Sequence, residues 1–407
     1  MRRLLDKLNL RFGRNEICGS LGDLGLFLPL AAGLSAVCGM NFGHILFFAG
    51  AMNLMSGLMF GIPIPVQPMK IIAAVAIAEG LRPDTIIAAG ILAGVIILIL
   101  ALTGLIDAVN RIIPKPVIRG LQLAIGIKLA LTSIDMIKST SFVPAFDSVF
   151  TAIALFIFVL ISFKYDKIPG ALALFIFGII LVVFGNPAIF RSLGFGWQSP
   201  EMTFPSMAAF IDGFWRGALP QLPLTILNSV IAVCALSFDL FPERPLKPGK
   251  IAASVSLMNL VACPLGGMPM CHGAGGLAAQ YRFGARTGGS VVFLGLVKMI
   301  LAVTFGSSLL AIISAYPASV LGVMLIFAGW QMIAVCLYMR AKSEIAIAVL
   351  TVSACLILGT TLGFAIGFVS AIVINKIAVS KKRAGHAAVW NSGWKTNDVE
   401  KFPEAIS

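Results

Sequence analysis

The sequence has few charged residues. Only 12% of its 407 residues are Asp, Glu, Lys or Arg, and 59% are hydrophobic, whereas ordinary soluble domains are about 25% charged. This shortage excludes a typical soluble globular protein and indicates a chain that crosses a lipid bilayer several times. No stretch between the apolar segments could hold a soluble domain of about 100 residues, so we treat the chain as one membrane unit.

Acidic residues are scarcer than basic ones, with 17 against 30 and a net charge of +13. The basic residues are spread over short loops and both ends of the chain, so the excess does not predict nucleic-acid binding. The seven cysteines include no CxxC pair and no metal-ligand spacing. We therefore expect no metal site and no cofactor, and we interpret the thiols as reduced packing residues.

The two ends of the chain differ from its middle. The first 16 residues, MRRLLDKLNLRFGRNE, are basic, carry leucines near helical spacing and lack a signal-peptide cleavage site. We expect residues 1–16 to form a cytoplasmic amphipathic segment, 17–379 the membrane domain, and 380–407 a cytoplasmic tail.

The apolar runs predict an all-α integral membrane protein with 14 transmembrane segments, if short runs are counted as broken helices. The expected segments lie near 17–38, 42–60, 67–79, 84–106, 115–133, 147–163, 168–185, 212–238, 248–262, 269–280, 289–314, 317–339, 343–360 and 362–379. With a cytoplasmic N-terminus, most loop Lys and Arg residues fall on the inner side. This orientation predicts a multi-pass protein of the inner (plasma) membrane with both termini in the cytoplasm.

The two halves of the chain resemble each other. GSLGDLGL at 19–26 aligns with GALPQLPL at 217–224, and VQPMK at 66–70 aligns with GMPMC at 267–271. PVIRG and PASVLG also open corresponding segments. Because seven segments are an odd number, the second copy must enter the membrane in the opposite direction, so we expect 7+7 inverted repeats over about 17–185 and 212–379.

Prolines and glycines interrupt the third and tenth segments, at GIPIPVQPMK (61–70) and PLGGMPMCHGAGG (264–276). Three prolines within a few residues forbid a continuous helix. Irregular backbone is tolerated inside a membrane where it is buried in protein or lines a wet cavity. Two half-helices whose N-termini meet near the midplane would present free N–H groups to an anion.

Neutral polar residues occur near both breaks and suit reversible binding of an anion. They are Gln67, Gln221, Thr225 and Asn228. Hydrogen bonding between helices is the alternative role for each of them, and for Thr225 in particular.

Three ionisable residues near the breaks have roles that the sequence leaves open. Lys70 could attract an anion or neutralise Asp23. His272 could bind substrate, carry a coupled proton, or be a hydrogen-bonded core histidine. Asp23 would repel an anion unless it is protonated or paired, so it is either a proton-coupling residue or the structural partner of Lys70. Ser20 accompanies Asp23, while Asp239 and Glu16 are weaker coupling candidates.

These motifs resemble the molybdate transporters of plants and bacteria, a family related to the sulfate permeases. The resemblance rests on NEICGSLGDLGLFLPL (15–30), FGIPIPVQPMKIIAAVAIAEG (60–80), PQLPLTILNSVIAVCALSFDLFP (220–242) and MNLVACPLGGMPMCHGAGGLAAQYRFGARTG (258–288). It implies the 7+7 inverted-repeat fold with core and gate domains, uptake of molybdate with tungstate or sulfate as competitors, and a homodimer in the lipid bilayer. The implied substrate-binding residues are Gln67, Pro68, Met69, Lys70, Gln221, Thr225, Asn228, Met270, Cys271, His272 and Gly273.

Other functions remain open at this point. A sulfate permease, another anion permease or a channel would share the fold. A nucleobase permease would be expected to carry a carboxylate where this chain has Gln221 and Asn228. A membrane enzyme would need an orienting third group beside Cys271 and His272, which point about 100° apart on a helix.

Overall fold

The computed structural model describes residues 8–112, 114–141, 146–162, 170–185 and 194–383, and the chain is mostly helical. Part of the expected N-terminal segment, residues 1–7, and most of the expected tail, residues 384–407, lie outside the described residues. The first described α-helix of the helical run, α2, begins at Arg14, and the last helix, α20, ends at Arg383.

The first half of the chain begins with one continuous helical run, Arg14–Ala36, followed by separate helices. The elements are α2 (Arg14–Ser20), η1 (Leu21–Asp23), α3 (Leu24–Ala36), α4 (Phe42–Phe60), β1 (Val66–Pro68), α5 (Lys70–Glu79), α6 (Pro83–Thr103), α7 (Ile106–Ile112), α8 (Lys115–Lys138), α9 (Val149–Ser162) and α10 (Gly170–Gly185).

The second half begins with a second long run, Met207–Leu240, which contains two π-helical stretches. Its elements are α12 (Met207–Gly213), η2 (Phe214–Ala218), α13 (Leu219–Leu224), η3 (Thr225–Ile231), α14 (Ala232–Leu240), α15 (Pro248–Ala262), η4 (Cys263–Leu265), β2 (Met270–His272), α16 (Ala274–Arg282), α17 (Gly289–Ser314), α18 (Ala318–Ala334), η5 (Val335–Tyr338), α19 (Lys342–Leu358) and α20 (Thr360–Arg383).

Several helices have the length and composition of membrane spans. Among the described residues six runs are long and apolar enough to cross a bilayer: Arg14–Ala36, Phe42–Phe60, Pro83–Thr103, Lys115–Lys138, Met207–Leu240 and Gly289–Gly306. Shorter apolar helices, among them α10 and α18, accompany them. The expectation of a mostly helical chain with several apolar helices is therefore confirmed.

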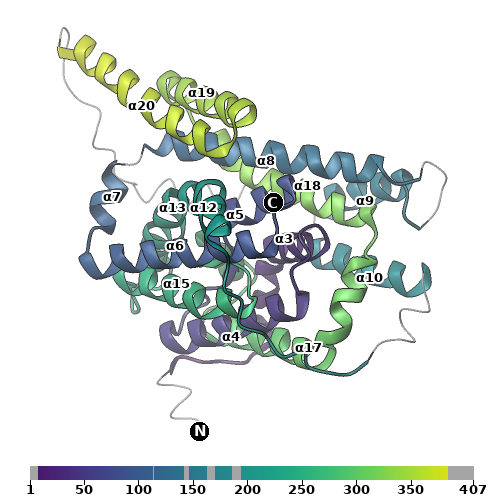
Figure 1. The fold of residues 1–407 in the computed structure, drawn as a ribbon. Coiled ribbons are helices and arrows are strands. Elements are labelled where there is room, and N and C mark those ends of the chain that lie inside the picture. Colours follow the sequence, from purple (N-terminus) through teal and green to yellow (C-terminus); the bar gives the residue numbers. More distant parts are fainter. Residues whose placement is uncertain (1–7, 113, 142–145, 163–169, 186–193, 384–407) are drawn as a thin grey trace.

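The helices pack in pairs that join distant parts of the chain. Helix α4 lies along α17, α6 lies along α15, and α8 lies along α18. In Figure 1, α4 and α17 form one side of the molecule, α19 and α20 form the opposite side, and α3, α5 and α6 lie between them. The centre of the molecule is thus built from both halves of the sequence.

The two proline-containing breaks meet as a short antiparallel ladder. Strand β1 pairs with β2, with Gln67 opposite Cys271 at its centre. The N–H of Met69 continues the pairing by donating to the carbonyl of Pro269 at 2.8 Å. Each strand has three residues, so the ladder spans about 10 Å at ~3.4 Å per residue. Helix α5 begins just after one strand and α16 just after the other.

The sequence placed the helix starts too early, near residues 67 and 269. The observed helices begin at Lys70 and Ala274. Pro68 is instead the last residue of β1, and Pro269 directly precedes β2. The extended backbone imposed by the prolines persists until the strand pairing ends.

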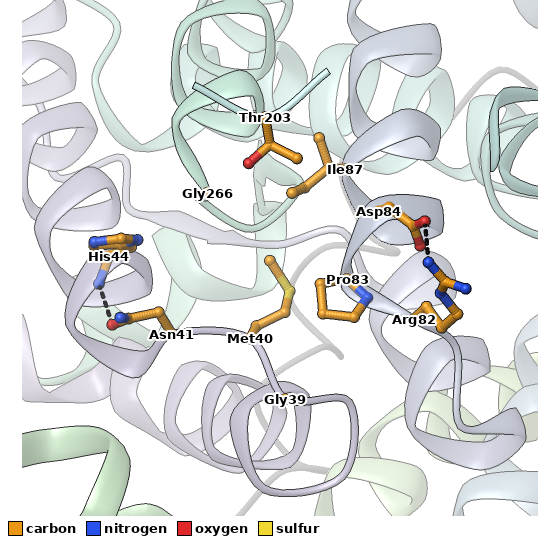
Figure 2. A pocket seen from close by; sticks show the side chains of 10 residues that line it. All are labelled: Gly39, Met40, Asn41, His44, Arg82, Pro83, Asp84, Ile87, Thr203 and Gly266. Carbon is orange, nitrogen blue, oxygen red and sulfur yellow. Dashed lines mark hydrogen bonds and ion pairs between the residues drawn. The ribbon is translucent and has the colours of Figure 1, made fainter. Parts of the chain in front are cut away.

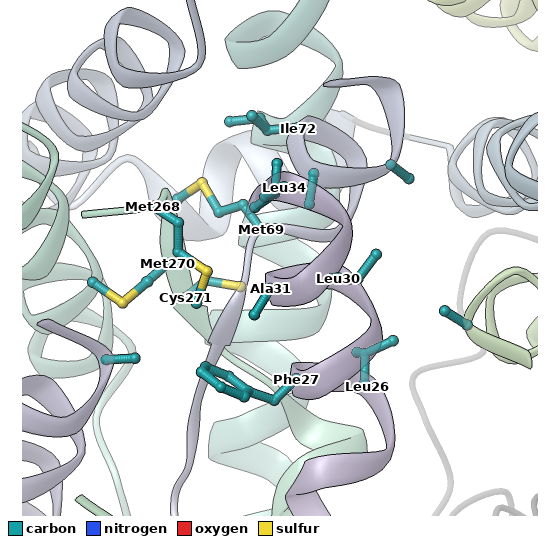
Figure 3. Close-up of a cluster of buried hydrophobic side chains, with 14 of the residues drawn as sticks. Leu26, Phe27, Leu30, Ala31, Leu34, Met69, Ile72, Met268, Met270 and Cys271 are labelled. Carbon is teal, nitrogen blue, oxygen red and sulfur yellow. The ribbon is translucent and has the colours of Figure 1, made fainter. Parts of the chain in front are cut away.

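Apolar side chains seal the ladder from one side. Figure 3 shows Phe27, Ala31 and Leu34 of α3 beside Met69 and Met270, within one buried cluster. The side chains of Phe27, Met69 and Met270 are fully buried. The irregular backbone is therefore enclosed by protein, as non-helical segments inside a membrane require.

Candidate functional site

Two buried asparagines hold the strands in place. Asn53 of α4 accepts a hydrogen bond from the N–H of Val66 at 2.7 Å. Asn259 of α15 accepts from the N–H of Met270 at 2.8 Å and donates to its carbonyl at 2.6 Å. Each asparagine therefore hydrogen-bonds the backbone of the first residue in the strand that follows its own helix. These bonds fix the positions where α5 and α16 begin.

The N-terminus of α5 is capped by a side chain from the other half of the chain. Gln221 Oε1 accepts hydrogen bonds from the N–H groups of Ile71 at 2.8 Å and Ile72 at 3.3 Å. Gln221 Nε2 in turn donates to Thr225 Oγ1 at 2.9 Å, one turn along the same helical run. Both side chains are buried. The sequence predicted two similar free helix ends, but at α5 two of the N–H groups already have a partner.

The N-terminus of α16 is different because its cap residue is Gly273, which has no side chain to offer. A Cβ added to Gly273 would overlap Gln67 Oε1, and one added to Gly276 would lie 2.6 Å from Gln67 Nε2. The amide of Gln67 thus lies directly on the first turn of α16. A Cβ on the half-buried Gly275 would meet no described residue within 4 Å apart from its chain neighbours and the backbone of its own helix, so this face of the turn is open.

Asp23 lies against the first turn of α16 but does not cap it: unlike Gln221 at α5, it accepts no hydrogen bond from the backbone of that turn within the described residues. Its Oδ1 accepts a hydrogen bond from Gln67 Nε2 at 2.5 Å and would lie 3.0 Å from a Cβ on Gly276. The side chain is 1% exposed. Asp23 Oδ2 and Gln67 Oε1 have no hydrogen-bond partner within the described residues. A carboxylate near a helix N-terminus is stabilised by the helix dipole, which stabilises bound anions in the same way.

His272 has a partner at each ring nitrogen. Nδ1 lies 3.3 Å from the carbonyl oxygen of Pro65, which can only accept, so Nδ1 carries the hydrogen. Nε2 then accepts from Ser254 Oγ at 3.0 Å, and the ring packs edge-on against Phe60. Of the three roles left open for His272, this geometry favours the hydrogen-bonded core histidine.

The remaining predicted binding residues lie on the strands themselves or on elements next to them, since α5 follows β1 directly and η3 contacts β2. Lys70 is half-buried at the first residue of α5, and Asn228 is half-buried in η3. Pro68, Met69, Met270 and Cys271 are buried in or next to the ladder and shape it through their backbone and apolar bulk.

Three weaker candidates are not brought into the site. Ser20 Oγ donates to the carbonyl of Ile17 in its own helix at 2.7 Å. Glu16 accepts from the N–H groups of Arg286 and Thr287, which fixes the turn before α17. Asp239 is exposed near the end of α14, about 20 Å along the helix from Thr225 at ~1.5 Å per residue.

A separate pocket of about 350 Å³ opens where α3 ends and α4 and α6 begin. Figure 2 shows Arg82 paired with Asp84 on one side and His44 bonded to Asn41 on the other. The lining includes none of the predicted binding residues. Its one arginine is already neutralised by an aspartate, so the pocket offers no free charge to an anion.

Comparison with known proteins settles the family. The family model described as "Molybdate transporter of MFS superfamily" matches residues 15–129 and 213–332, which contain the ladder, Asp23 and Gln221. The chain belongs to the molybdate transporter family.

Curated members of the family are similar over nearly the whole chain. Molybdate transporter 1 of Arabidopsis thaliana is 36% identical, with 88% of each chain covered. Molybdate transporter 2 of the same plant is 38% identical, covering 81% of this chain and 80% of that one. Molybdate transporter 1 of Chlamydomonas reinhardtii is 32% identical over 92% of this chain and 94% of that one. These relatives are transporters, which confirms the expectation of a transporter and excludes the membrane-enzyme alternative.

Solved structures of anion transporters share the fold. A structure of SLC26A9 aligns with a TM-score of 0.66 at 14% identity over 89% of this chain, and the chain spans 65% of that protein's length. The transmembrane domain of the cyanobacterial bicarbonate transporter BicA aligns with a TM-score of 0.63 at 16% identity, covering 88% of this chain and 97% of that one. A structure of murine Slc26a9 in the inward-facing state aligns with a TM-score of 0.68 at 14% identity, covering 93% of this chain and 70% of that one.

The sequence of this molybdate transporter family member contains two signals that our predictions missed. Asn53 and Asn259 are polar residues inside apolar helices ahead of each break, and such residues usually have a specific partner. Lys298 is a lone charge in the middle of the apolar run of α17, and an ionisable residue there is a functional candidate by default.

Proposed function

We propose that this chain transports molybdate across a membrane by alternating access, with the oxyanion bound at the open first turn of α16. Family membership supports the substrate. The observation that carries the location is the glycine turn Gly273–Gly276, which has no capping side chain and an open face at Gly275. A helix N-terminus of this kind binds oxyanions through free backbone N–H groups and the helix dipole.

The neighbouring side chains suit this ligand. Gln67 and Asn228 offer amide groups, and half-buried Lys70 adds a positive charge at the start of α5. Hydrogen bonds to a charged ligand are stronger than neutral ones, yet neutral donors avoid the tight trapping that several arginines would cause. Gln221 and Thr225 support the site indirectly, because they hold the start of α5 in position.

The proposal includes 14 transmembrane segments in 7+7 inverted repeats. The packing pairs support it, since exchanging the two halves maps the pair α4 and α17 onto the pair α15 and α6. The two strands support it as well. The spacing along the chain between Val66 and Met270, which begin the two strands, equals the spacing between Lys70 and Ala274, which begin the helices after them. The broken third and tenth segments then provide the midplane site, and core and gate domains move against each other around it.

Proton coupling through Asp23 is part of the proposal. Asp23 lies against the first turn of α16, so its negative charge would compete with the substrate. A proton bound there removes the competition, and proton and oxyanion then favour each other's binding.

Tungstate and sulfate are proposed as competing substrates because they are tetrahedral dianions like molybdate. We further propose that the protein lies in the inner (plasma) membrane with both termini in the cytoplasm, and that it forms a homodimer. These features follow from the loop charges and the family resemblance.

Uptake into liposomes tests the function. Purified protein should accumulate molybdate inside the vesicles, faster when the outside is acidic, and unlabelled tungstate should compete. Uptake of sulfate with no effect of molybdate would overturn the assignment, and a current without saturable uptake would indicate a channel.

A further inference from the structure

Lys298 is a lysine buried within the membrane-spanning part of α17. It lies near the middle of the apolar run Gly289–Gly306 of α17, about 14 Å along the helix from its start at ~1.5 Å per residue. Its side chain is 3% exposed, and Nζ has no hydrogen-bond acceptor within the described residues. Such a residue is costly in a membrane protein and is normally kept for a function.

The ammonium group points towards the candidate site. Nζ lies 3.4 Å from the centre of the Phe27 ring, and Phe27 is one helical turn after Asp23. Asp23 is within electrostatic range of both Lys298 and Lys70. The lysine is therefore held by a cation–π contact near a carboxylate of which one oxygen, Asp23 Oδ2, has no hydrogen-bond partner in the described part of the chain.

The charges around Asp23 can be counted. Lys298 from α17 and Lys70 from α5 are positive, Asp23 is negative, and Gln67 from β1 and Cys271 from β2 are neutral. Once Asp23 is protonated, two positive charges remain. A buried site is most favourable when its charges balance, and two positive charges balance one dianion.

We propose that Lys298 is a specificity-determining residue that, together with Lys70, selects a doubly charged tetrahedral oxyanion over a singly charged one. This inference rests on the proposed function, because it concerns the same site. The competing explanation is that Lys298 and Asp23 only neutralise each other, in which case removing both charges together would leave anion binding intact.

Two anions of similar shape and different charge separate these explanations. Molybdate is a tetrahedral dianion, and perrhenate is a tetrahedral monoanion of similar size. Coulomb energy is proportional to ligand charge, so loss of one lysine costs a dianion twice the free energy that it costs a monoanion. The fold-loss for molybdate should then be about the square of the fold-loss for perrhenate.

The experiment measures equilibrium binding of both anions to the purified full chain and to Lys298→Met. We expect molybdate affinity to fall by at least about tenfold when perrhenate affinity falls by about threefold. Equal losses for the two anions would overturn the charge-selection role. Lys128→Met, which removes a lysine of α8 that is paired with Glu79, serves as the control and should change neither affinity.

Two further variants keep the test decisive if Lys298→Met does not fold. Asp23→Asn/Lys298→Met removes both buried charges, and it is compared with Asp23→Asn alone. We expect the double variant to bind molybdate at least about tenfold more weakly than the single variant, with the smaller loss for perrhenate. Equal molybdate affinity in the two would overturn the inference while leaving the proposed function intact. Failure of the wild-type chain to bind molybdate would overturn both.

Discussion

Gln67 Nε2 donates a hydrogen bond to Asp23 Oδ1 at 2.5 Å, and both side chains are almost fully buried. This bond joins the middle of β1 to the first helical run of the chain, directly over the first turn of α16. Gln67 therefore orients the Asp23 carboxylate, and in the proposed mechanism the two residues should act as one unit in binding.

Replacing Gln67 by Ala should lower molybdate affinity by about tenfold or more, since one hydrogen bond to a charged group contributes about 1.5–3 kcal/mol. Binding to purified protein is the measurement. Gln122→Ala, a buried glutamine of α8, is the matched control for loss of a buried amide. If both variants lose stability equally and neither loses affinity selectively, Gln67 has no role in binding.

Asp23→Asn should abolish the pH dependence of uptake while keeping the bond from Gln67, because the amide oxygen still accepts. In the wild-type chain, protonation of Asp23 favours the dianion, so uptake should rise as pH falls, by up to about tenfold per pH unit for one linked proton. Lys70, Lys298 and Cys271 also face Asp23, and none of them changes in this variant. Initial uptake rates of both proteins, measured from about pH 5 to about pH 8, test this expectation. An unchanged profile would remove Asp23 as the proton carrier.

Gln221→Leu should destabilise the protein by about 1–3 kcal/mol, because the N–H groups of Ile71 and Ile72 lose their buried acceptor. Thermal unfolding in detergent measures the change. Thr225→Val removes only the bond between Gln221 and Thr225 and should cost less, about 0.5–1.5 kcal/mol. Equal small effects for both variants would contradict the capping role.

Gly276→Ala and Gly275→Ala should have opposite effects on stability. A methyl at Gly276 would lie 2.6 Å from both Gln67 Nε2 and Pro65 Cγ, and such overpacking costs about 1–3 kcal/mol. A methyl at Gly275 meets no protein atom within 4 Å and removes a flexible residue from a helix, which is worth about 0.5–1 kcal/mol.

Molybdate affinity distinguishes the two glycines further. If the open face at Gly275 holds the oxyanion, Gly275→Ala should weaken molybdate binding without any loss of stability. Full affinity in Gly275→Ala would place the substrate elsewhere.

The sequence predicted a helical membrane protein and the positions of both breaks, because long apolar runs and clustered prolines determine the structure of their own segment. It did not predict that the two breaks pair as strands, with Gln67 opposite Cys271. Strand register depends on long-range partners such as Asn53 and Asn259, which local patterns do not show.

The candidate site was predicted in part. Gln67, Asp23 and Gln221 were selected from their positions beside the breaks, and the structure brings Gln67 and Asp23 together. The capping of α5 by Gln221 could not be predicted, because it depends on a contact between residues 150 positions apart. Asp239 was selected for its charge alone, and it lies at the far end of its helix.

Thermal stabilisation of the purified chain by added anions is the direct test of a molybdate site at the first turn of α16, since a ligand that binds only the folded state raises the apparent melting temperature. We expect stabilisation by molybdate and tungstate, and a clear reduction of that shift in Gln67→Ala. Stabilisation by sulfate alone, or an equal molybdate shift in wild type and Gln67→Ala, would contradict a molybdate site at the first turn of α16.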